Sequence, residues 1–243
     1  MMKFDDLIIM GQDIAEYGGV FKITEGFVEL FGKERVRNTP ICESSIIEIA
    51  MGLSICNRKS IVELQFSDFI TSGFNPVVNY LAKVHYRWGQ NADVVLRMPC
   101  GAGVGAGPFH SQTNEAWFTK TPGLIVVYPA FPDDAKGLLI SSIENPNPVL
   151  FFEHKALYRS IRGKVPEGYY NIEIGKLLID GGMVQNSTFC QILADTLQKE
   201  LVRPKNVEST AIGACKVAMI GSGTSLANIQ TKKLSFVPNK NLE

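Results

Sequence analysis

The chain has 243 residues, of which 45% are hydrophobic and 20% charged, a balance typical of a globular protein with one large domain or two small ones. Its 24 Lys and Arg residues equal its 24 Asp and Glu residues, so the formal net charge is zero. No basic stripe of the kind found in nucleic-acid-binding proteins is visible. We therefore expect no nucleic-acid partner.

The five cysteines are an odd number, and none belongs to a C-x-x-C pair, which disfavours a disulfide framework or a structural zinc site. We assign no metal ligands in this chain. The first residues, MMKFDDLIIMGQD, match neither a signal peptide nor an Arg-rich transit peptide, and no run reaches the roughly 18 apolar residues of a membrane span. These features predict a cytoplasmic protein with reduced thiols and no membrane partner.

Short apolar, β-branched runs alternate with segments of helical period, the pattern of an α/β fold with a mainly parallel sheet. The predicted strands cover residues 7–11, 60–66, 93–99, 123–130 and 148–154. The predicted helices cover residues 24–32, 43–55, 75–88 and 132–144. Sheets of this kind place their ligands at the carboxyl ends of the strands.

Two of these helices carry further signals. The helix predicted for 43–55 places four apolar side chains along one face, those of Ile46, Ile47, Ala50 and Leu53. In the helix predicted for 75–88, Pro76 is tolerated because it falls in the first turn.

The character of the sequence changes near residue 176. The stretch VPEGYYNIEIGK (165–176) is polar and rich in turn residues, and KLLIDGG then restarts a strand-turn pattern. Residues 186–201 predict an amphipathic helix capped by Asn186 or Ser187. Residues 208–223 predict a further helix that ends at a glycine. The apolar face expected for the first of these helices consists of Phe189, Ile192, Leu193 and Leu197. We therefore predict two domains, 1–175 and 176–243.

A glycine-rich loop, GAGVGAGPFHSQ (101–112), follows the strand predicted for 93–99. Gly101, Gly103 and Ala106 match the G-x-G-x-x-[GA] pattern of dinucleotide-binding loops. That pattern needs a helix N-terminus to hold the pyrophosphate, but Pro108 and a further glycine stand there instead. The next strand also ends in Tyr-Pro rather than in the acid that binds a ribose. The residues therefore disfavour a nicotinamide site.

Two interpretations of the loop remain open on these residues alone: a flexible surface loop, and a loop that serves the histidine at its end. His110 is one of only three histidines, and it lies beyond the end of a predicted central strand. Glycines allow the backbone to pass close to a bulky ligand. An imidazole titrates near neutral pH, so a positioned histidine can transfer protons or bind a carboxylate.

Six motifs in order carry a resemblance to a known family: GQDIAEYGGVFKITEGF, RVRNTPICES, VELQFSDF, RMPCGAGVGAGPFHSQTNEAWF, TPGLIVVYP and VLFFEHKALYR. Over about residues 5–176 the chain resembles the beta subunit, or beta half, of the thiamine-dependent decarboxylating component of 2-oxo acid dehydrogenase complexes, of the branched-chain or pyruvate type. The resemblance implies a three-layer α/β, parallel-sheet, transketolase-like pyrimidine-binding domain. The first helix of that domain is expected to be missing ahead of LIIMGQD.

The resemblance also implies roles for individual residues. Glu43, in TPICES, matches the glutamate that faces N1′ of the aminopyrimidine of thiamine diphosphate, whereas a glutamate at a helix start is ordinarily a partner of the helix dipole. Phe69 matches the ring that stacks on the aminopyrimidine, although a lone phenylalanine more often packs in a core. His110 matches a histidine near the reactive carbon of the cofactor, where it binds the carboxylate of the 2-oxo acid or transfers a proton during reductive acylation. Tyr17, Gly18 and Gly19 are candidates for lining the mouth of the same cofactor site. The alternative for the two glycines is that they only shape a turn.

The family binds Mg²⁺ and the diphosphate through a G-D-G…N motif of its alpha subunit, and this chain has no such motif. The resemblance thus implies half of a cofactor site, completed by an alpha subunit, with a lipoyl acyltransferase as a further partner. The substrate it implies is a 2-oxo acid, either branched-chain or pyruvate, or alternatively acetoin. The C-terminal domain of the family is replaced by another sequence.

From residue 176 the chain resembles the adenosine-binding C-terminal region of glycerol kinase and related sugar kinases, through KLLIDGGMVQNSTFCQILADTLQKELVRPKNVESTAIGACKVAMIGSG. The resemblance implies a short α/β fragment in which Gly181 and Gly182 let adenosine lie against the backbone and Asn186 contacts the adenine edge. A glycine pair is otherwise an ordinary turn signal. The phosphate loop and catalytic base of these kinases have no counterpart here, so the alternatives to a dehydrogenase subunit are a nucleotide-binding fragment and a non-catalytic fusion remnant.

Overall fold

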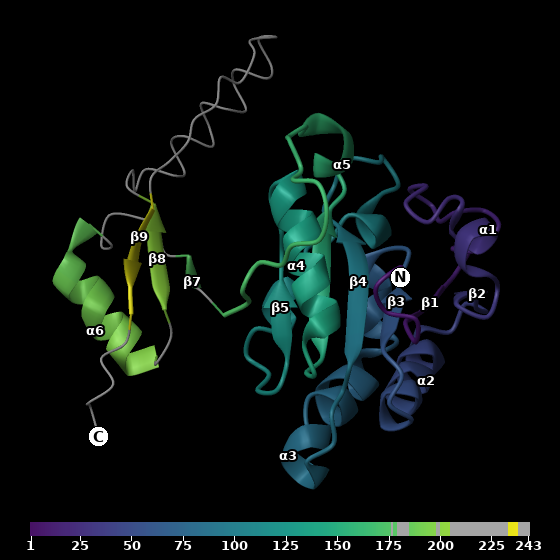
Figure 1. The fold of residues 1–243 in the computed structure, drawn as a ribbon, viewed down its shortest axis with the longest axis horizontal. Helices are drawn as coiled ribbons and strands as arrows, with labels where there is room; N and C mark the ends of the chain where they lie inside the picture. The colour runs from purple at the N-terminus through teal and green to yellow at the C-terminus, as the bar shows by residue number, and fades with distance from the viewer. Residues whose placement is uncertain (176, 179–184, 198–199, 205–232, 238–243) are drawn as a thin grey trace. The chain divides into compact units, whose positions relative to one another are not determined.

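The structure, a computed structural model, describes residues 1–175, 177–178, 185–197, 200–204 and 233–237. The chain divides into two compact units, Met1–Ile172 and Glu173–Glu243. Figure 1 shows the elements of both units. No helix in these described ranges has the length and apolar character that a membrane crossing requires.

The first unit is built on a six-stranded sheet in the order β2-β1-β3-β4-β6-β5, and every pairing is parallel. The strands are β1 (Ile8–Gly11), β2 (Val36–Asn38), β3 (Ser60–Glu63), β4 (Val94–Cys100), β5 (Ile125–Val127) and β6 (Val149–His154). This architecture confirms the predicted α/β fold with a parallel sheet. The carboxyl ends of all six strands therefore lie at one edge of the sheet.

One face of the sheet packs against α2 (Glu43–Ile55) and forms the main core. Side chains alternate between faces along a strand, and Val62, Leu96 and Phe152 point to this side. From α2 the buried positions Ile46, Ile47 and Ala50 meet them, while Leu53 packs partly buried at the edge, as predicted. The helix forms because this apolar stripe recurs at helical spacing and has a sheet to cover.

The opposite face packs against α4 (Pro132–Glu144) and α5 (Leu157–Ser160). The bounds of α4 agree with the sequence prediction at both ends. Pro132 occupies the first turn, where its missing N–H costs nothing, and Asp133 and Asp134 complement the positive end of the helix.

The predicted helix over 75–88 is wrong in its middle. The structure has a π-helical segment, η2 (Pro76–Leu81), then a break, then the short helix α3 (Val84–Trp88). At the break, the backbone of Gly123 lies so close to the carbonyl of Ala82 that a Cβ on the glycine would be 1.8 Å from that oxygen. A tertiary contact thus interrupts a segment whose local sequence favours a continuous helix.

Other elements are shorter than predicted or were not predicted. The strand over 60–66 ends at Glu63, and the 3₁₀ helix η1 (Ser67–Thr71) follows it. The helix over 24–32 contracts to α1 (Phe27–Phe31). Neither β2 nor α5 was predicted, because three or four residues are too few to display a hydrophobic period.

The second unit contains a three-stranded sheet in the order β7-β8-β9, with β7 and β8 parallel and β8 and β9 antiparallel. Its described elements are β7 (Leu177–Leu178), α6 (Ser187–Leu197), β8 (Leu201–Pro204) and β9 (Lys233–Phe236). Asn186 caps α6, because its side-chain Oδ1 accepts a hydrogen bond from the N–H of Phe189 at 3.1 Å.

Two sequence predictions for this unit need correction. The helix over 186–201 ends at Leu197, and β8 begins at Leu201. The predicted apolar face is also displaced, since Ile192 is 60% exposed while the smaller Cys190 and Ala194 are buried. The helix predicted over 208–223 lies outside the described residues.

The core of the first unit predicts a large difference between two isoleucines of α2. Ile47 is fully buried, whereas Ile49 is 56% exposed. Ile47→Ala should lower the free energy of unfolding by about 2–5 kcal/mol, because it removes packed methyl groups and leaves a cavity. Ile49→Ala is the matched control and should change it by less than about 0.5 kcal/mol. Urea unfolding followed by the fluorescence of Trp88 and Trp117, both in the first unit, measures the difference. Equal losses in the two variants would contradict this assignment of the core.

Candidate active site at the carboxyl ends of the strands

The three residues singled out from the sequence come from segments that follow three different strands. Glu43 opens α2 after β2, Phe69 lies in η1 after β3, and His110 ends the 3₁₀ turn η3 (Pro108–His110) after β4. Because the strands are parallel, these segments meet at the same edge of the sheet. A chain of contacts, which runs through the hydroxyl of Ser72 and the backbone carbonyl of Phe69, connects the three residues.

The carboxylate of Glu43 is buried, with the residue only 7% exposed. Gln12, from the segment after β1, donates through Nε2 to Glu43 Oε1 at 3.1 Å, and the hydroxyl of Ser72 donates to Oε2 at 3.2 Å. No Lys or Arg in the described part of the chain forms an ion pair with this carboxylate. Two neutral donors and the start of a helix therefore hold the group in place.

Ser72 also links Glu43 to Phe69, because its hydroxyl lies 3.0 Å from the carbonyl oxygen of Phe69. The Phe69 ring is half-buried and meets the His110 imidazole edge to face, with centroids 5.4 Å apart and an interplanar angle of 82°. Phe66 meets the same imidazole at 4.8 Å and 88°. Two phenylalanine rings thus contact the imidazole, and its buried Nδ1 has no hydrogen-bond partner among the residues that the structure describes.

The glycine loop has the conformation that its sequence suggests. Its four glycines, Gly101, Gly103, Gly105 and Gly107, all have positive φ angles, which side chains of L-residues rarely adopt. At Gly101 a Cβ would lie 2.3 Å from Nε2 of His154. The loop leads into a single 3₁₀ turn rather than an α-helix, so it presents no helix N-terminus to a pyrophosphate.

The other candidates for the mouth of the site have local structural reasons for their identity. Gly18 has a positive φ, and a Cβ there would lie 2.7 Å from the Cα of Glu25. Gly19 also has a positive φ and makes a turn hydrogen bond to the carbonyl of Asp13. Tyr17 is largely exposed, with the ammonium group of Lys22 3.4 Å from its ring centroid. These contacts explain the two glycines as turn residues.

Two buried charged residues at this edge were missed by the sequence reasoning. Oδ1 of Asp68 accepts hydrogen bonds from the N–H groups of Ser111 and Gln112, both at 3.1 Å. Nζ of Lys155 donates to the carbonyl oxygen of His110 at 2.9 Å. Their positions alone offered a signal, because each comes shortly after a predicted strand, at the edge where ligands bind.

The kinase-like tail is only partly described. The Oδ1 atom of Asn186 caps α6 by accepting a hydrogen bond from the N–H of Phe189. Gly181 and Gly182 lie outside the described residues.

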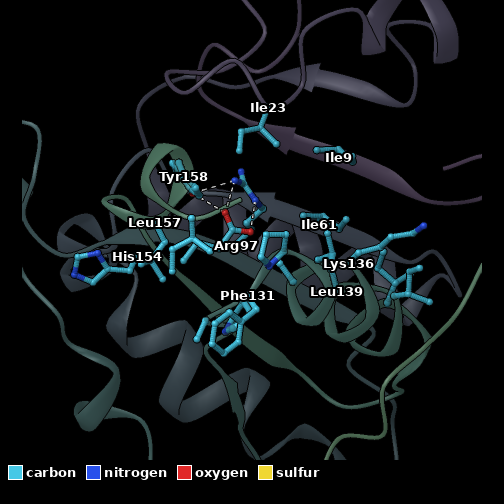
Figure 2. A pocket seen from close by; sticks show the side chains of 18 of the residues that line it. Ile9, Ile23, Ile61, Arg97, Phe131, Lys136, Leu139, His154, Leu157 and Tyr158 are labelled. Atoms are coloured by element: carbon cyan, nitrogen blue, oxygen red, sulfur yellow. Dashed lines mark hydrogen bonds and ion pairs between the residues drawn. The ribbon is translucent and has the colours of Figure 1, made fainter. Parts of the chain in front are cut away.

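A cavity of about 670 Å³ lies on the other face of the sheet, the side covered by α4. Figure 2 shows its lining, with Ile9, Ile61 and Arg97 on the sheet side and Lys136 and Leu139 on the side of α4. Ile9, Ile61 and Arg97 alternate along their strands with residues of the main core, so the cavity is separated from that core by the sheet. Glu43, Phe69 and His110 do not line it.

Arg97, one of the residues that line this cavity, joins three strands. Its guanidinium contacts Glu153 of β6 twice, with Nε 2.9 Å from Oε1 and Nη2 2.5 Å from Oε2, and Nη1 also pairs with Glu63 of β3. The hydroxyl of Tyr158 donates to Glu153, as the dashed lines in Figure 2 mark. Burial raises the pKa of the Glu63 carboxyl, and the positive charge of Arg97 opposes that rise. The group is therefore a buried ion cluster that depends on Arg97.

The domain family described as "Transketolase, pyrimidine binding domain" matches residues 1–160. The C-terminal domain of the "FGGY family of carbohydrate kinases" matches residues 150–222. Both findings agree with the resemblances that the motifs indicate.

Curated relatives match the first part of the chain. The beta subunit of 2-oxoisovalerate dehydrogenase from Bacillus subtilis is 44% identical over 178 residues, which cover 72% of this chain and 54% of the relative. The beta subunit of the pyruvate dehydrogenase E1 component from Staphylococcus epidermidis is 41% identical over 200 residues, which cover 77% of this chain and 62% of the relative. The corresponding subunit from Staphylococcus aureus is 41% identical over 195 residues, 75% of this chain and 60% of the relative.

The match to the transketolase pyrimidine-binding domain covers residues 1–160, more than half of the chain, so the protein belongs to this domain family. Its sequence is similar to the beta subunits of 2-oxo acid dehydrogenases of the branched-chain and pyruvate types. The matched region spans between about one half and two thirds of the length of those relatives.

The Arg97 cluster predicts a strong contrast with a surface arginine. Arg97→Met leaves two buried carboxylates without their cation and should lower the free energy of unfolding by about 3–5 kcal/mol. The control is Arg37→Met, which breaks an exposed pair with Glu34 and should cost less than about 1 kcal/mol. Urea unfolding of the two variants against the parent measures both values. A loss at Arg97 no larger than that at Arg37 would refute the dependence of the cluster on this arginine.

Proposed function

We propose that this chain is a beta-type subunit of a thiamine-dependent 2-oxo acid dehydrogenase and that its first unit binds the aminopyrimidine side of thiamine diphosphate. The observation that carries the proposal is the buried carboxylate of Glu43, held by Gln12 and Ser72 at the sheet edge where the Phe69 and His110 rings also meet. The similarity to beta subunits of two such dehydrogenases supports it.

The residues at this edge fit the cofactor in three respects. Glu43 offers a carboxyl group with neutral hydrogen-bond partners, which suits a ring nitrogen that must exchange a proton. Phe69 offers a half-buried aromatic ring for stacking. The buried Nδ1 of His110 has no partner within the described residues, so it is available to a bound group.

Thiamine diphosphate, when bound, would supply the carbon nucleophile that decarboxylation of a 2-oxo acid requires. The contribution of this chain is then to bind, orient and move protons. Glu43 holds or releases a proton at its carboxyl oxygens while Gln12 and Ser72 keep those oxygens oriented. His110 binds the carboxylate of the substrate or transfers a proton during acyl transfer.

The remaining parts of the site belong to partners in this proposal. An alpha subunit binds Mg²⁺ and the diphosphate, and a lipoyl acyltransferase receives the acyl group. The substrate is a branched-chain 2-oxo acid or pyruvate, the two types named by the relatives. A non-catalytic remnant is the alternative that the following experiment separates from this proposal.

The proposal predicts that Glu43 is essential for turnover. The chain, mixed with an alpha subunit of a 2-oxo acid dehydrogenase, thiamine diphosphate, Mg²⁺ and either 3-methyl-2-oxobutanoate or pyruvate, should reduce an artificial electron acceptor. Glu43→Gln should lower kcat by about 10²–10⁴, the range for loss of a general acid–base group. Glu48→Gln is the matched control, because Glu48 lies exposed on the same helix, and its kcat should equal that of the parent.

Absence of turnover in the parent with each alpha subunit and substrate would favour the remnant. Equal kcat values for the Glu43 variant and the parent would remove Glu43 from the mechanism.

A second candidate, nucleotide binding by the kinase-like tail, is supported by the match of residues 150–222 to a carbohydrate-kinase domain. The full chain should then release or absorb heat on titration with ATP. Asn186→Asp is an informative variant, because aspartate caps a helix as well as asparagine does but cannot donate to an adenine ring. We expect the heat of binding to disappear in this variant while the melting temperature is unchanged. An absence of heat with the parent chain would contradict this candidate.

A further inference from the structure

The segment His110-Ser111-Gln112 is held by two buried charged side chains whose hydrogen bonds go to its backbone. Asp68 accepts from the N–H groups of Ser111 and Gln112, and Lys155 donates to the carbonyl of His110. Lys155, directly after β6, and Asp68, in η1, bind the C=O and the N–H of the same His110–Ser111 peptide group, and Asp68 also binds the N–H of the next one. The segment is therefore fixed independently of the His110 side chain.

Both side chains are buried to an extent that is unusual for a charge, with 5% of each residue exposed. Burial lowers the pKa of the Lys155 ammonium, and attraction to Asp68 opposes that change. The second carboxylate oxygen of Asp68 is buried, and no group in the described part of the chain forms a hydrogen bond with it. Burying two charged side chains is energetically costly, and the hydrogen bonds of both side chains go to one short stretch of backbone.

The loop before this segment cannot hold His110 by itself. Residues 101–107 contain four glycines in conformations with positive φ, and they offer few side chains for packing. The imidazole contacts Phe66 and Phe69, but edge-to-face ring contacts contribute only about 0.5–1.5 kcal/mol each. Hydrogen bonds to charged groups are stronger than neutral ones and fix direction as well as distance.

We propose that Asp68 and Lys155 are positioning residues that hold His110 against Phe66 and Phe69 at the carboxyl edge of the sheet. The catalytic significance of this position rests on the proposed function, whereas the positioning itself does not. Lys155 also lies over the Phe66 ring, 5.0 Å from its centroid, so one cation contacts both the backbone and the aromatic support of the histidine.

The test measures the accessibility of His110 in the full chain without any activity. Diethyl pyrocarbonate modifies exposed imidazoles, and peptide mass spectrometry resolves the rate at each of the three histidines of the chain. His85, which is exposed on α3, is the internal reference. The quantity of interest is the rate at His110 divided by the rate at His85.

Lys155→Met and Asp68→Ala should each raise this ratio about tenfold or more, because loss of a hydrogen bond to a charged group favours local opening by at least that factor. Lys155→Arg should restore a ratio near that of the parent, since it keeps a cationic donor. Asp68→Asn keeps Oδ1 as an acceptor and should change the ratio less than twofold. Lys136→Met is the matched control: it removes a lysine that donates to the carbonyl of Pro166, and it should leave the ratio unchanged.

An unchanged ratio in both Lys155→Met and Asp68→Ala would overturn the proposal, as would an equal rise in Lys136→Met. If Lys155→Met does not fold, the double variant Asp68→Asn/Lys155→Met removes both buried charges and should still raise the ratio, because the bond to His110 is lost. A double variant with the parent ratio would also overturn the proposal.

The assembled enzyme provides a second readout. With the alpha subunit present, Lys155→Met should lower kcat about tenfold or more, with Lys155→Arg restoring it and Glu48→Gln unaffected. A kcat equal to that of the parent, together with raised labelling of His110, would refute a catalytic benefit of the position. If the parent itself shows no turnover, the proposed function fails, and the labelling ratio still decides whether Asp68 and Lys155 position His110.

Discussion

The parallel pairing of all six strands is the constraint on which the candidate site depends. Parallel strands run in one direction, so the segments that leave β1, β2, β3, β4 and β6 begin at the same edge. These segments contribute Gln12, Glu43, Phe69, His110 and Lys155, which are spread over more than half of the chain. No single motif could bring these groups together, because each is separated from the next by a helix or a long connection.

Different interactions on the two faces of the sheet hold that edge in place. On one face α2 is anchored by Ile46, Ile47 and Ala50, and this anchoring sets the position of Glu43 at its first turn. On the other face Arg97 joins β3, β4 and β6 through Glu63 and Glu153. Lys155 follows Glu153 by two residues, so the ion cluster on one face and the support of His110 at the edge share the end of β6. Apolar packing therefore positions the carboxylate, and buried charge supports the segment that carries the histidine.

The sequence was sufficient for elements with strong local signals. The bounds of α4 could be predicted at both ends, because Pro132 and two acids mark its start, and the apolar stripe of α2 is regular. The helix over 75–88 could not, since its interruption comes from the close approach of Gly123, which lies about 40 residues further along the chain than Ala82. The roles of Asp68 and Lys155 could not be predicted for a related reason. Each bonds to backbone more than 40 residues away, and a backbone partner leaves no trace in the residue types of the sequence.

The two family matches overlap over residues 150–160, and the structure shows to which unit this overlap belongs. Residues of β6 pair in parallel with β4 along six positions and with β5 along three, entirely within the first unit. The same stretch supplies Glu153 to the Arg97 cluster and Lys155 to the His110 segment. Strand β6 is therefore part of the pyrimidine-binding domain. The similarity to the carbohydrate-kinase family can point to a separate function only in the second unit, from Glu173 onward. Every residue of the candidate active site precedes that point, so the chemistry proposed at the sheet edge and nucleotide binding by the tail are separate questions about one chain.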